Sequence, residues 1–254
     1  MRLLESGKKI PVTKRFYRDF YSDRLEMFYV KYKFTDLCIR VDKFEKSMLG
    51  TVYDLVKTNY EALESYINIH KEFYASLVPV ECLERVPDIV LMMDNASKLA
   101  DVGPMASVAG AFADIVGNHL VENYRCEEVV VENGGDIYIR SKKPVKIGIF
   151  ANFNSEFNKL LIVLPSGSWG VCTSSGKIGH SRSFGSTDAT CVIAKTSVIA
   201  DAFATRYGNI VHSSLDFEKL EMMVKEDIEK ENILGAISIV NSKLFAIGNI
   251  QFSV

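Results

Sequence analysis

The spacing of hydrophobic residues changes along the chain and predicts a different kind of element in each part. Hydrophobic and polar residues alternate over residues 25–42, which predicts the two strands of a hairpin with a turn at Thr35–Asp36. Apolar residues then recur every three or four positions over residues 44–77, which predicts one long amphipathic helix with a candidate break at Gly50. The same spacing predicts two more helices, over residues 87–101 and 105–124.

From Glu127 onward the apolar residues mostly alternate with polar ones or form short runs, as is typical of strands. The predicted strands cover residues 127–133, 137–141, 145–151, 159–165, 169–174, 190–196, 234–240, 243–248 and 250–254. Tight turns are predicted at Asn133–Asp136 and Asn241–Ser242. Helices are predicted at 197–209, with Ser197 as N-cap, and at 215–231. Long helices followed by meandering strands predict an α+β fold.

The composition adds limits on partners and on location. The 254 residues are 48% hydrophobic and 24% charged, which is enough to bury a sizeable core. A net charge of −2 gives no indication of nucleic acid or of an anionic membrane as a partner. No run approaches the roughly 18 apolar residues of a membrane-spanning helix, and no signal-peptide pattern is present, so we expect a cytoplasmic protein. Five widely spaced cysteines without a CxxC argue against a disulfide framework or a thiolate zinc site.

The segment "ADAFAT" is the first candidate for chemistry. Asp201 and Thr205 are four positions apart in a predicted helix, so their side chains share one face. A carboxylate and a hydroxyl are hard oxygen donors that suit Mg²⁺, and Mg²⁺ commonly completes its shell with water and substrate phosphates. The alternative is a capping or packing role, with the neighbouring alanines packed closely.

The segments "ENGGDIYI" and "VCTSSG" could approach a ligand with their backbones. Gly134 and Gly135 allow positive φ and close approach, and Asp136 could bind a ribose or a ring edge. A simple hairpin turn explains the two glycines equally well. Residues 173–176 offer hydroxyls and backbone N–H groups that can surround a phosphate or a carbonyl oxygen.

Cys172 and His180 form a second kind of candidate. They are eight residues apart, so a thiolate–imidazole pair would need the intervening loop to fold back. The alternatives are a nucleophilic Cys172 with His180 as its base, and a buried thiol at the end of a strand.

Four segments together resemble a known family. In order they are "VGPMASVAGAFAD", "VVVENGGDIYI", "GVCTSSGKIGHSRSFGSTDA" and "VIADAFATRYGN". They closely resemble an uncharacterised ApbE-like family of prokaryotes, within the superfamily of ApbE, the FAD:protein FMN transferases formerly called thiamine biosynthesis lipoproteins. The resemblance covers nearly the whole chain. It implies a single ApbE-like domain over residues 1–254, in which helices flank an antiparallel sheet, and it implies FAD and Mg²⁺ as cofactors.

The resemblance also implies roles for individual residues. Asp201 and Thr205 match metal ligands of the transferases, and the backbone carbonyl of Ala106 matches a third. His180 matches the histidine of the transferases in order. The residues matching the flavin-nucleotide pocket and the loop against the cofactor are Gly134, Gly135, Asp136, Thr173, Ser174, Ser175 and Gly176. The lysine that the transferases carry at the helix start is absent from "MASVAG".

Three hypotheses for function follow. The first is a cytoplasmic ApbE-like protein that binds FAD, or another diphosphate-containing ligand, with Mg²⁺, and whose candidate reaction is transfer of FMN to a protein acceptor. The second is a sulfur-transfer or sulfide-assimilation protein that uses Cys172. The third is a non-catalytic ligand-binding module. The apolar C-terminal strands are a candidate homodimer interface.

Overall fold

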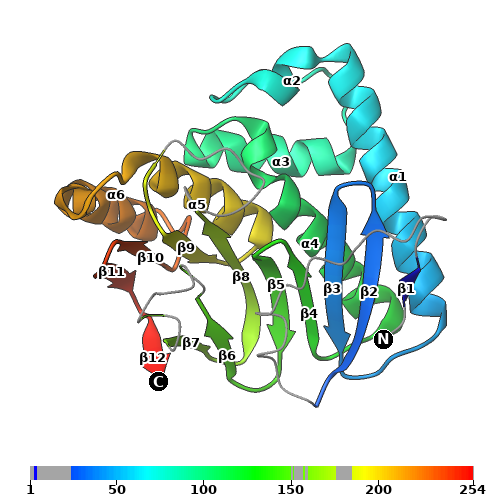
Figure 1. The fold of residues 1–254 in the computed structure, drawn as a ribbon. Coiled ribbons are helices and arrows are strands. Elements are labelled where there is room, and N and C mark those ends of the chain that lie inside the picture. Colours follow the sequence, from blue (N-terminus) through cyan, green and yellow to red (C-terminus); the bar gives the residue numbers. More distant parts are fainter. Residues whose placement is uncertain are drawn as a thin grey trace.

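A nine-stranded sheet forms the centre of the part of the chain that the computed structural model describes, residues 3–4, 24–149, 151, 157, 160–175 and 185–253 (Figure 1). Its strands are Leu3–Leu4 (β1), Glu26–Tyr32 (β2), Thr35–Val41 (β3), Val129–Asn133 (β4), Asp136–Ser141 (β5), Gly167–Ser174 (β8), Ala189–Ala194 (β9), Gly235–Val240 (β10) and Lys243–Gly248 (β11). They follow the order β1-β2-β3-β4-β5-β8-β9-β10-β11, and every neighbouring pair is antiparallel except β1–β2. The antiparallel sheet predicted from the sequence is confirmed.

A second, three-stranded sheet lies against one face of the main sheet. Its strands are Val145–Gly148 (β6), Leu161–Leu164 (β7) and Gln251–Ser253 (β12), and the order is β12-β7-β6. Buried side chains of both sheets, such as Ile139, Ile162 and Ile237, form one apolar layer between them. The last strand of the chain therefore pairs with β7 and does not extend the main sheet beyond β11.

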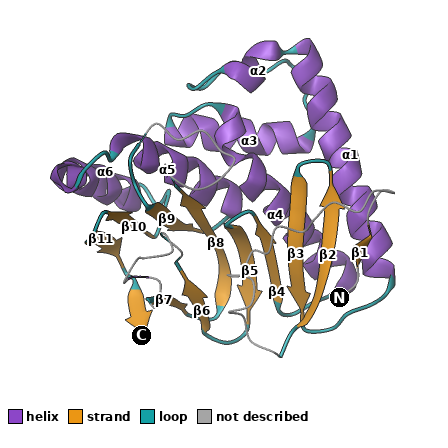
Figure 2. Cartoon of the chain, viewed as in Figure 1, coloured by secondary structure: helices purple, strands orange, loops and turns teal. Residues whose placement is uncertain are grey.

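The other face of the main sheet is covered by helices (Figure 2). The helices of the described residues are Ser47–Ile69 (α1), Lys71–Ala75 (α2), Asp88–Ala100 (α3), Val108–Tyr124 (α4), Ser197–Ile210 (α5) and Phe217–Glu229 (α6), with short 3₁₀ turns at Pro104–Ser107 (η2) and Ser214–Asp216 (η4). Helices with strands between and after them, on an antiparallel sheet, confirm the α+β class. α1 runs through Gly50 without a break, because one exposed glycine costs a helix only about 1 kcal/mol.

Two of the three predicted tight turns are confirmed and one is shifted. Asn133 pairs with Asp136 across the β4–β5 turn, and Val240 pairs with Lys243 across the β10–β11 turn. The first hairpin instead turns at Lys33–Phe34, two residues before the predicted Thr35–Asp36. Lys33 takes the positive φ of 49° that the turn needs. A β-branched residue such as threonine favours a strand, and Thr35 begins β3.

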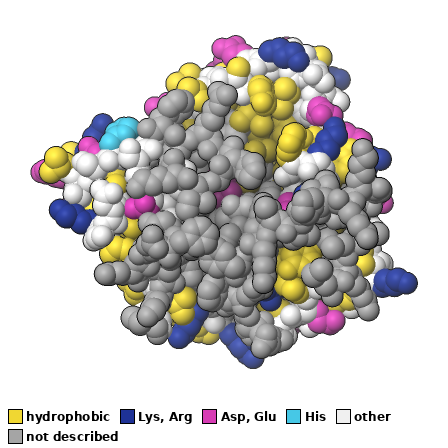
Figure 3. All heavy atoms as spheres, in the orientation of Figure 1, with side chains coloured by type: hydrophobic (Ala, Val, Ile, Leu, Met, Phe, Trp, Pro, Cys, Tyr) yellow, Lys and Arg dark blue, Asp and Glu magenta, His cyan; other side chains and the backbone are white. Residues whose placement is uncertain are grey.

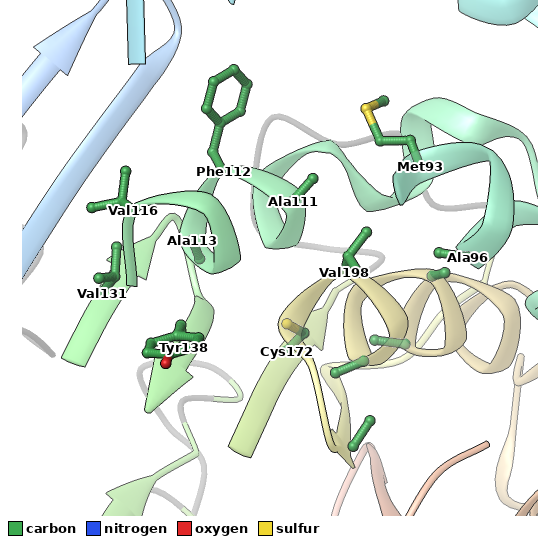
Figure 4. Packing of buried hydrophobic residues seen from close by; sticks show 14 of the residues in the cluster. Met93, Ala96, Ala111, Phe112, Ala113, Val116, Val131, Tyr138, Cys172 and Val198 are labelled. Atoms are coloured by element: carbon green, nitrogen blue, oxygen red, sulfur yellow. The ribbon is translucent and has the colours of Figure 1, made fainter. Parts of the chain in front are cut away.

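The larger apolar core lies between the helices and the main sheet (Figure 4). Two glycines of α4 allow close packing in this core. A Cβ atom on Gly110 would overlap the carbonyl oxygen of Ser197 in α5, and one on Gly117 would overlap the ring of Tyr138 in β5. Close packing onto α5 and the sheet therefore explains these two small residues of α4.

The described helices give one finding about membranes. No single helix among them has the length and apolar composition to cross a bilayer. Only α3 and the η2–α4 segment taken together reach that composition, and they are bent by 105° where they meet.

Candidate functional site

The candidate metal ligands meet where α5 packs antiparallel to α4. Asp201 and Thr205 lie one turn apart on α5, as the sequence predicts, and both face the start of α4 and the turn η2 before it. Asp201 Oδ2 accepts the backbone N–H of Gly110 at 2.9 Å. The hydroxyl of Thr205 lies 3.4 Å from the carbonyl oxygen of Ala106. A carboxylate, a hydroxyl and a carbonyl therefore gather at one end of the α4–α5 contact.

Burial and a second carboxylate determine the electrostatics of Asp201. Only 8% of Asp201 is exposed, and Asp136 at the start of β5 is buried as well. Desolvation raises the pKa of Asp201 well above its usual range, and the charge of Asp136 raises this pKa further, against the lowering effect of the Gly110 and Ala109 N–H groups. Two buried carboxylates that influence each other favour either a shared proton or a cation nearby.

Asp114 of α4 accepts hydrogen bonds from the start of α5, as Asp201 of α5 does from the start of α4. Its two carboxylate oxygens accept the backbone N–H groups of Ser197 at 2.9 Å and of Val198 at 2.8 Å. The prediction of Ser197 as the N-cap is wrong, because Thr196 holds that position and the Ser197 hydroxyl donates to the carbonyl oxygen of Ile137. Each helix thus supplies a buried aspartate to the first turn of the other, where backbone N–H groups lack helical partners.

We expect Asp114 to make stability depend on pH. Burial raises the pKa of Asp114 from 3.8 to about 6, so the folded state holds a proton that the unfolded state loses first. The contribution is therefore fully present below about pH 4 and is lost as the pH rises through about 6. Relative to the Asp114→Asn variant, the free energy of unfolding of the unmodified protein should fall by up to about 3 kcal/mol between pH 4 and pH 7. Urea titrations of both proteins across that range measure it, and a constant difference would contradict the assignment.

The β4–β5 turn lies between the start of α4 and the end of β8. The side-chain amide of Asn133 donates to the carbonyl oxygen of Ala109 at 3.1 Å, which fixes the turn against α4. Gly134 and Gly135 both have positive φ, 73° and 113°. A Cβ atom on Gly135 would lie 3.9 Å from the carbonyl oxygen of Thr173, so the turn also approaches β8.

The predicted cofactor loop lies only partly within the described residues. Ser174 and Ser175 are half-buried at the end of β8. The Thr173 side chain hydrogen-bonds the thiol of Cys191, which belongs to the apolar layer on the far side of the sheet. Thr173 can therefore face a ligand on the helical side only with its backbone. Gly176 and His180 lie outside the described residues.

Cys172 has the environment of a structural thiol. It is fully buried in the core between β8 and α5, close to Val198 (Figure 4), and its thiol donates to the carbonyl oxygen of Ser197 at 3.2 Å. Burial raises the pKa of Cys172 well above its usual range, and the charges of Asp136 and Asp201 raise it further. A nucleophilic thiolate needs the opposite, access and a lowered pKa. The structure favours the buried strand thiol over the nucleophile.

The donor set suits a hard cation that shares its shell with a ligand. Across the described ranges, no group of three or more His, Cys, Asp or Glu side chains gathers. Asp201, Thr205 and the Ala106 carbonyl instead supply three oxygen donors of different kinds from two neighbouring elements. Mg²⁺ accepts few protein ligands when phosphate oxygens and water supply the rest. The raised pKa of the buried Asp201 carboxyl group beside Asp136 is consistent with a cation as the missing charge.

Sequence reasoning did not find Asp114. One signal was available, since it is the lone carboxylate on the buried face of the small-residue segment "AGAFADIVG". Its partners Ser197 and Val198 are more than eighty residues away along the chain, at separations of 83 and 84. Only the tertiary structure joins them.

Comparison with solved structures gives the fold. The flavinyl transferase ApbE of Pseudomonas stutzeri, in its apo form, aligns with a TM-score of 0.59 at 15% identity, over 91% of this chain and 96% of that one. The apbe protein of Thermotoga maritima aligns with a TM-score of 0.52 at 13% identity, over 90% of this chain and 97% of that one. At these identities, the likeness shows a shared α+β fold.

Comparison with sequences gives the family. A family model described as "AbpE bacteria" matches residues 18–243. A UPF0280 protein of Methanocaldococcus jannaschii is 37% identical over 223 residues, which cover 86% of this chain and 88% of that protein. A UPF0280 protein of Methanothermobacter thermautotrophicus is 37% identical over 191 residues, which cover 74% and 73%. With matches of this extent, the chain belongs to the uncharacterised ApbE-like family.

Proposed function

We propose that this protein binds FAD, or another ligand with a diphosphate, together with Mg²⁺ at the α4–α5 contact, and that it acts as a flavin transferase. The observation that carries the proposal is the meeting of Asp201, Thr205 and the Ala106 carbonyl beside a second buried carboxylate, Asp136. The shared fold with two ApbE proteins, one of them named a flavinyl transferase, supports the choice of ligand.

Each group has a task that follows from its chemistry. Mg²⁺, when bound, would offset the charge of the diphosphate. Asp201 and Thr205 would hold it through a carboxylate and a hydroxyl on one face of a rigid helix. Gly134 and Gly135, which both have positive φ, place no side chain in the β4–β5 turn that would obstruct a ligand. The Ser174 and Ser175 hydroxyls at the end of β8 are candidate donors to the ligand.

The transfer reaction would join FMN to a hydroxyl of an acceptor protein. The acceptor oxygen forms a bond to the FMN phosphorus, the diphosphate bond breaks, AMP leaves and the hydroxyl proton passes to solvent. The candidate docking surface for the acceptor is formed by α2 and its neighbours. α2 packs against η2, which carries the Ala106 carbonyl. Figure 3 shows hydrophobic side chains gathered near α1 and α2, and the exposed large ones at the end of α1, in α2 and just after it are Ile69, Tyr74, Leu77 and Val78.

Binding is tested by titrating the protein into FAD and following flavin fluorescence, once with Mg²⁺ and once with EDTA. We expect saturable binding with Mg²⁺ and at least about tenfold weaker binding with EDTA, a difference of about 1.4 kcal/mol. Absence of binding in both buffers would contradict the proposal. Transfer is tested separately, by the gain of the mass of FMN less one water on a threonine-containing acceptor peptide. Binding without that gain would leave a non-catalytic flavin-binding protein.

The role of Cys172 gives a prediction of its own. We expect Cys172→Ala to bind FAD and Mg²⁺ within about twofold of the unmodified protein, because the thiol faces the core, and to lose about 1 kcal/mol of stability, as buried substitutions commonly do. Cys172 should resist a thiol reagent in the folded protein and react after unfolding. Rapid labelling of folded Cys172, found by peptide mapping, would instead favour sulfur transfer.

A further inference from the structure

A basic cavity of about 400 Å³ lies at the opposite end of the main sheet from the candidate FAD site. It is formed where α4 ends, β5 ends and β8 begins, at the lower ends of these elements in Figure 1. Its lining includes Arg125, Cys126, Glu127, Arg140, Lys142, Gly167 and Ser168. Arg140 is four residues beyond Asp136 along β5, so the cavity and the candidate FAD site are separated by about 13 Å along this strand.

The charges that line this cavity are unbalanced. Lys142 pairs with Glu127, with Nζ and Oε1 2.6 Å apart. Arg125 and Arg140 form no ion pair with any residue that the structure describes, so two guanidinium groups border one cavity without a counter-charge. Burial raises the pKa of the Cys126 thiol to about 11, so the thiol is neutral at physiological pH and adds no negative charge. An anion in the cavity would be attracted by both arginines.

The size and the donors of the cavity suit a phosphate group. A volume of about 400 Å³ lies within the range of small-molecule sites, roughly 300–1,000 Å³. Arginine presents a planar fork of donors that matches phosphate oxygens. Ser168 lies opposite Arg140 in the β5–β8 pair, and the side chains of Ser168 and Tyr138 are hydrogen-bonded. Because that bond uses the single proton of the serine hydroxyl, the charged donors for a ligand are the two guanidinium groups.

We propose that this cavity is a second ligand site, which binds a small phosphate-bearing anion through Arg125 and Arg140. The ligand is inorganic phosphate or a phosphate monoester, since both present the same group to the two arginines. The site is independent of the proposed FAD site, because it shares no residue with it and lies at the other end of β5 and β8.

The chain contains its own reporter for this site. Trp169 is its single tryptophan, and its indole N–H donates to the carbonyl oxygen of Pro165. A Cβ atom on Gly167, which lines the cavity, would lie 3.0 Å from the Trp169 ring, although the indole itself packs into the apolar layer on the other face of β8. Binding of an anion beside Gly167 and Ser168 should change the tryptophan fluorescence.

The test titrates inorganic phosphate and, separately, glycerol 3-phosphate into the metal-free protein at constant ionic strength, with Trp169 fluorescence and calorimetry as parallel readouts. We expect saturation with a Kd of about 1 mM or below for at least one of the two anions. The double variant Arg125→Gln/Arg140→Gln should raise that Kd at least tenfold. Lys143→Gln, which changes a neighbouring cation outside the cavity, should leave it within twofold. Saturation by phosphate alone identifies free phosphate, and saturation by the ester identifies a monoester.

Two results would overturn the second site. One is the lack of saturation by either anion in both readouts. The other is binding that the double variant keeps at full strength, which would place the anion elsewhere. A titration with FAD distinguishes the second site from the FAD site. The double variant should bind FAD as the unmodified protein does. Circular dichroism confirms folding, which we expect to be intact because both arginines are exposed.

Discussion

Asp201→Asn is expected to abolish the stabilisation of this protein by Mg²⁺ and FAD. The substitution keeps an oxygen that can accept the Gly110 N–H, but it removes the negative charge that would hold the cation. A ligand present at 100 times its Kd stabilises a protein by about 2.7 kcal/mol, and the variant should lose that entire gain. Without ligand, the variant no longer buries a carboxyl group beside Asp136 but loses the acceptor for the Ala109 N–H, so its stability should stay within about 1 kcal/mol of that of the unmodified protein. Thermal unfolding with and without Mg²⁺ and FAD measures both effects.

Two substitutions of Thr205 are matched controls for the Asp201→Asn experiment. Thr205→Ser keeps the hydroxyl and should retain the Mg²⁺-dependent rise in unfolding temperature. Thr205→Val keeps the shape and removes the hydroxyl, so it should lose most of that rise. If Mg²⁺ and FAD stabilise the Asp201→Asn variant as strongly as the unmodified protein, Asp201 is not a metal ligand.

Gly110→Ala is expected to be strongly destabilising. The added methyl group would overlap the carbonyl oxygen of Ser197, which is backbone and cannot rotate away. The α4–α5 contact would have to open, and with it the hydrogen bonds between Asp201 and Gly110 and between Asp114 and the start of α5. We expect a loss of about 3 kcal/mol or more in the free energy of unfolding, together with loss of FAD binding.

Gly50→Ala is the control for that experiment. Gly50 also lies within a helix, α1, but a Cβ atom there would meet no atom within 4 Å. Alanine should therefore stabilise the protein by up to about 1 kcal/mol through helix propensity alone. Chemical denaturation of both variants distinguishes the effects. Equal effects of the two substitutions would mean that the close approach of α4 and α5 is not what Gly110 provides.

Most helices and strands could be predicted from the sequence because their periodicity is local. α3, α5 and the β4–β5 and β10–β11 turns lie within a few residues of the predicted positions. The errors fall where local preference and tertiary packing disagree. Thr35–Asp36 resembles a turn, but Thr35 pairs with Tyr32 inside the hairpin. Gly50 resembles a helix break, but the buried face of α1 on either side of it keeps the helix continuous.

The arrangement of the site could be predicted only in part. The spacing of Asp201 and Thr205 places both on one face of a helix, and the family resemblance adds the Ala106 carbonyl. The long-range contacts could not be read from one sequence, because Asp114 and Ser197 are 83 residues apart. The same limit applies to β12, whose pairing with β7 is set by the second sheet and not by its neighbour β11.

The structure also distinguishes between alternatives that the sequence left open. Cys172 looked like half of a catalytic pair beside His180, but its thiol is buried against Ser197 and its pKa is raised by that burial. Close packing of α4 against the Ser197 carbonyl accounts for Gly110. Both outcomes move the candidate chemistry to the oxygen donors at the α4–α5 contact.

The central claim is that the oxygens of Asp201, Thr205 and Ala106 hold a divalent cation against the diphosphate of FAD. The most direct test is a crystal grown with FAD and Mn²⁺, in which anomalous scattering locates the metal. We predict one anomalous peak within bonding distance of Asp201 and Thr205, beside the Ala106 carbonyl and in contact with the diphosphate. A peak at any other place, or FAD bound away from the α4–α5 contact, would contradict it.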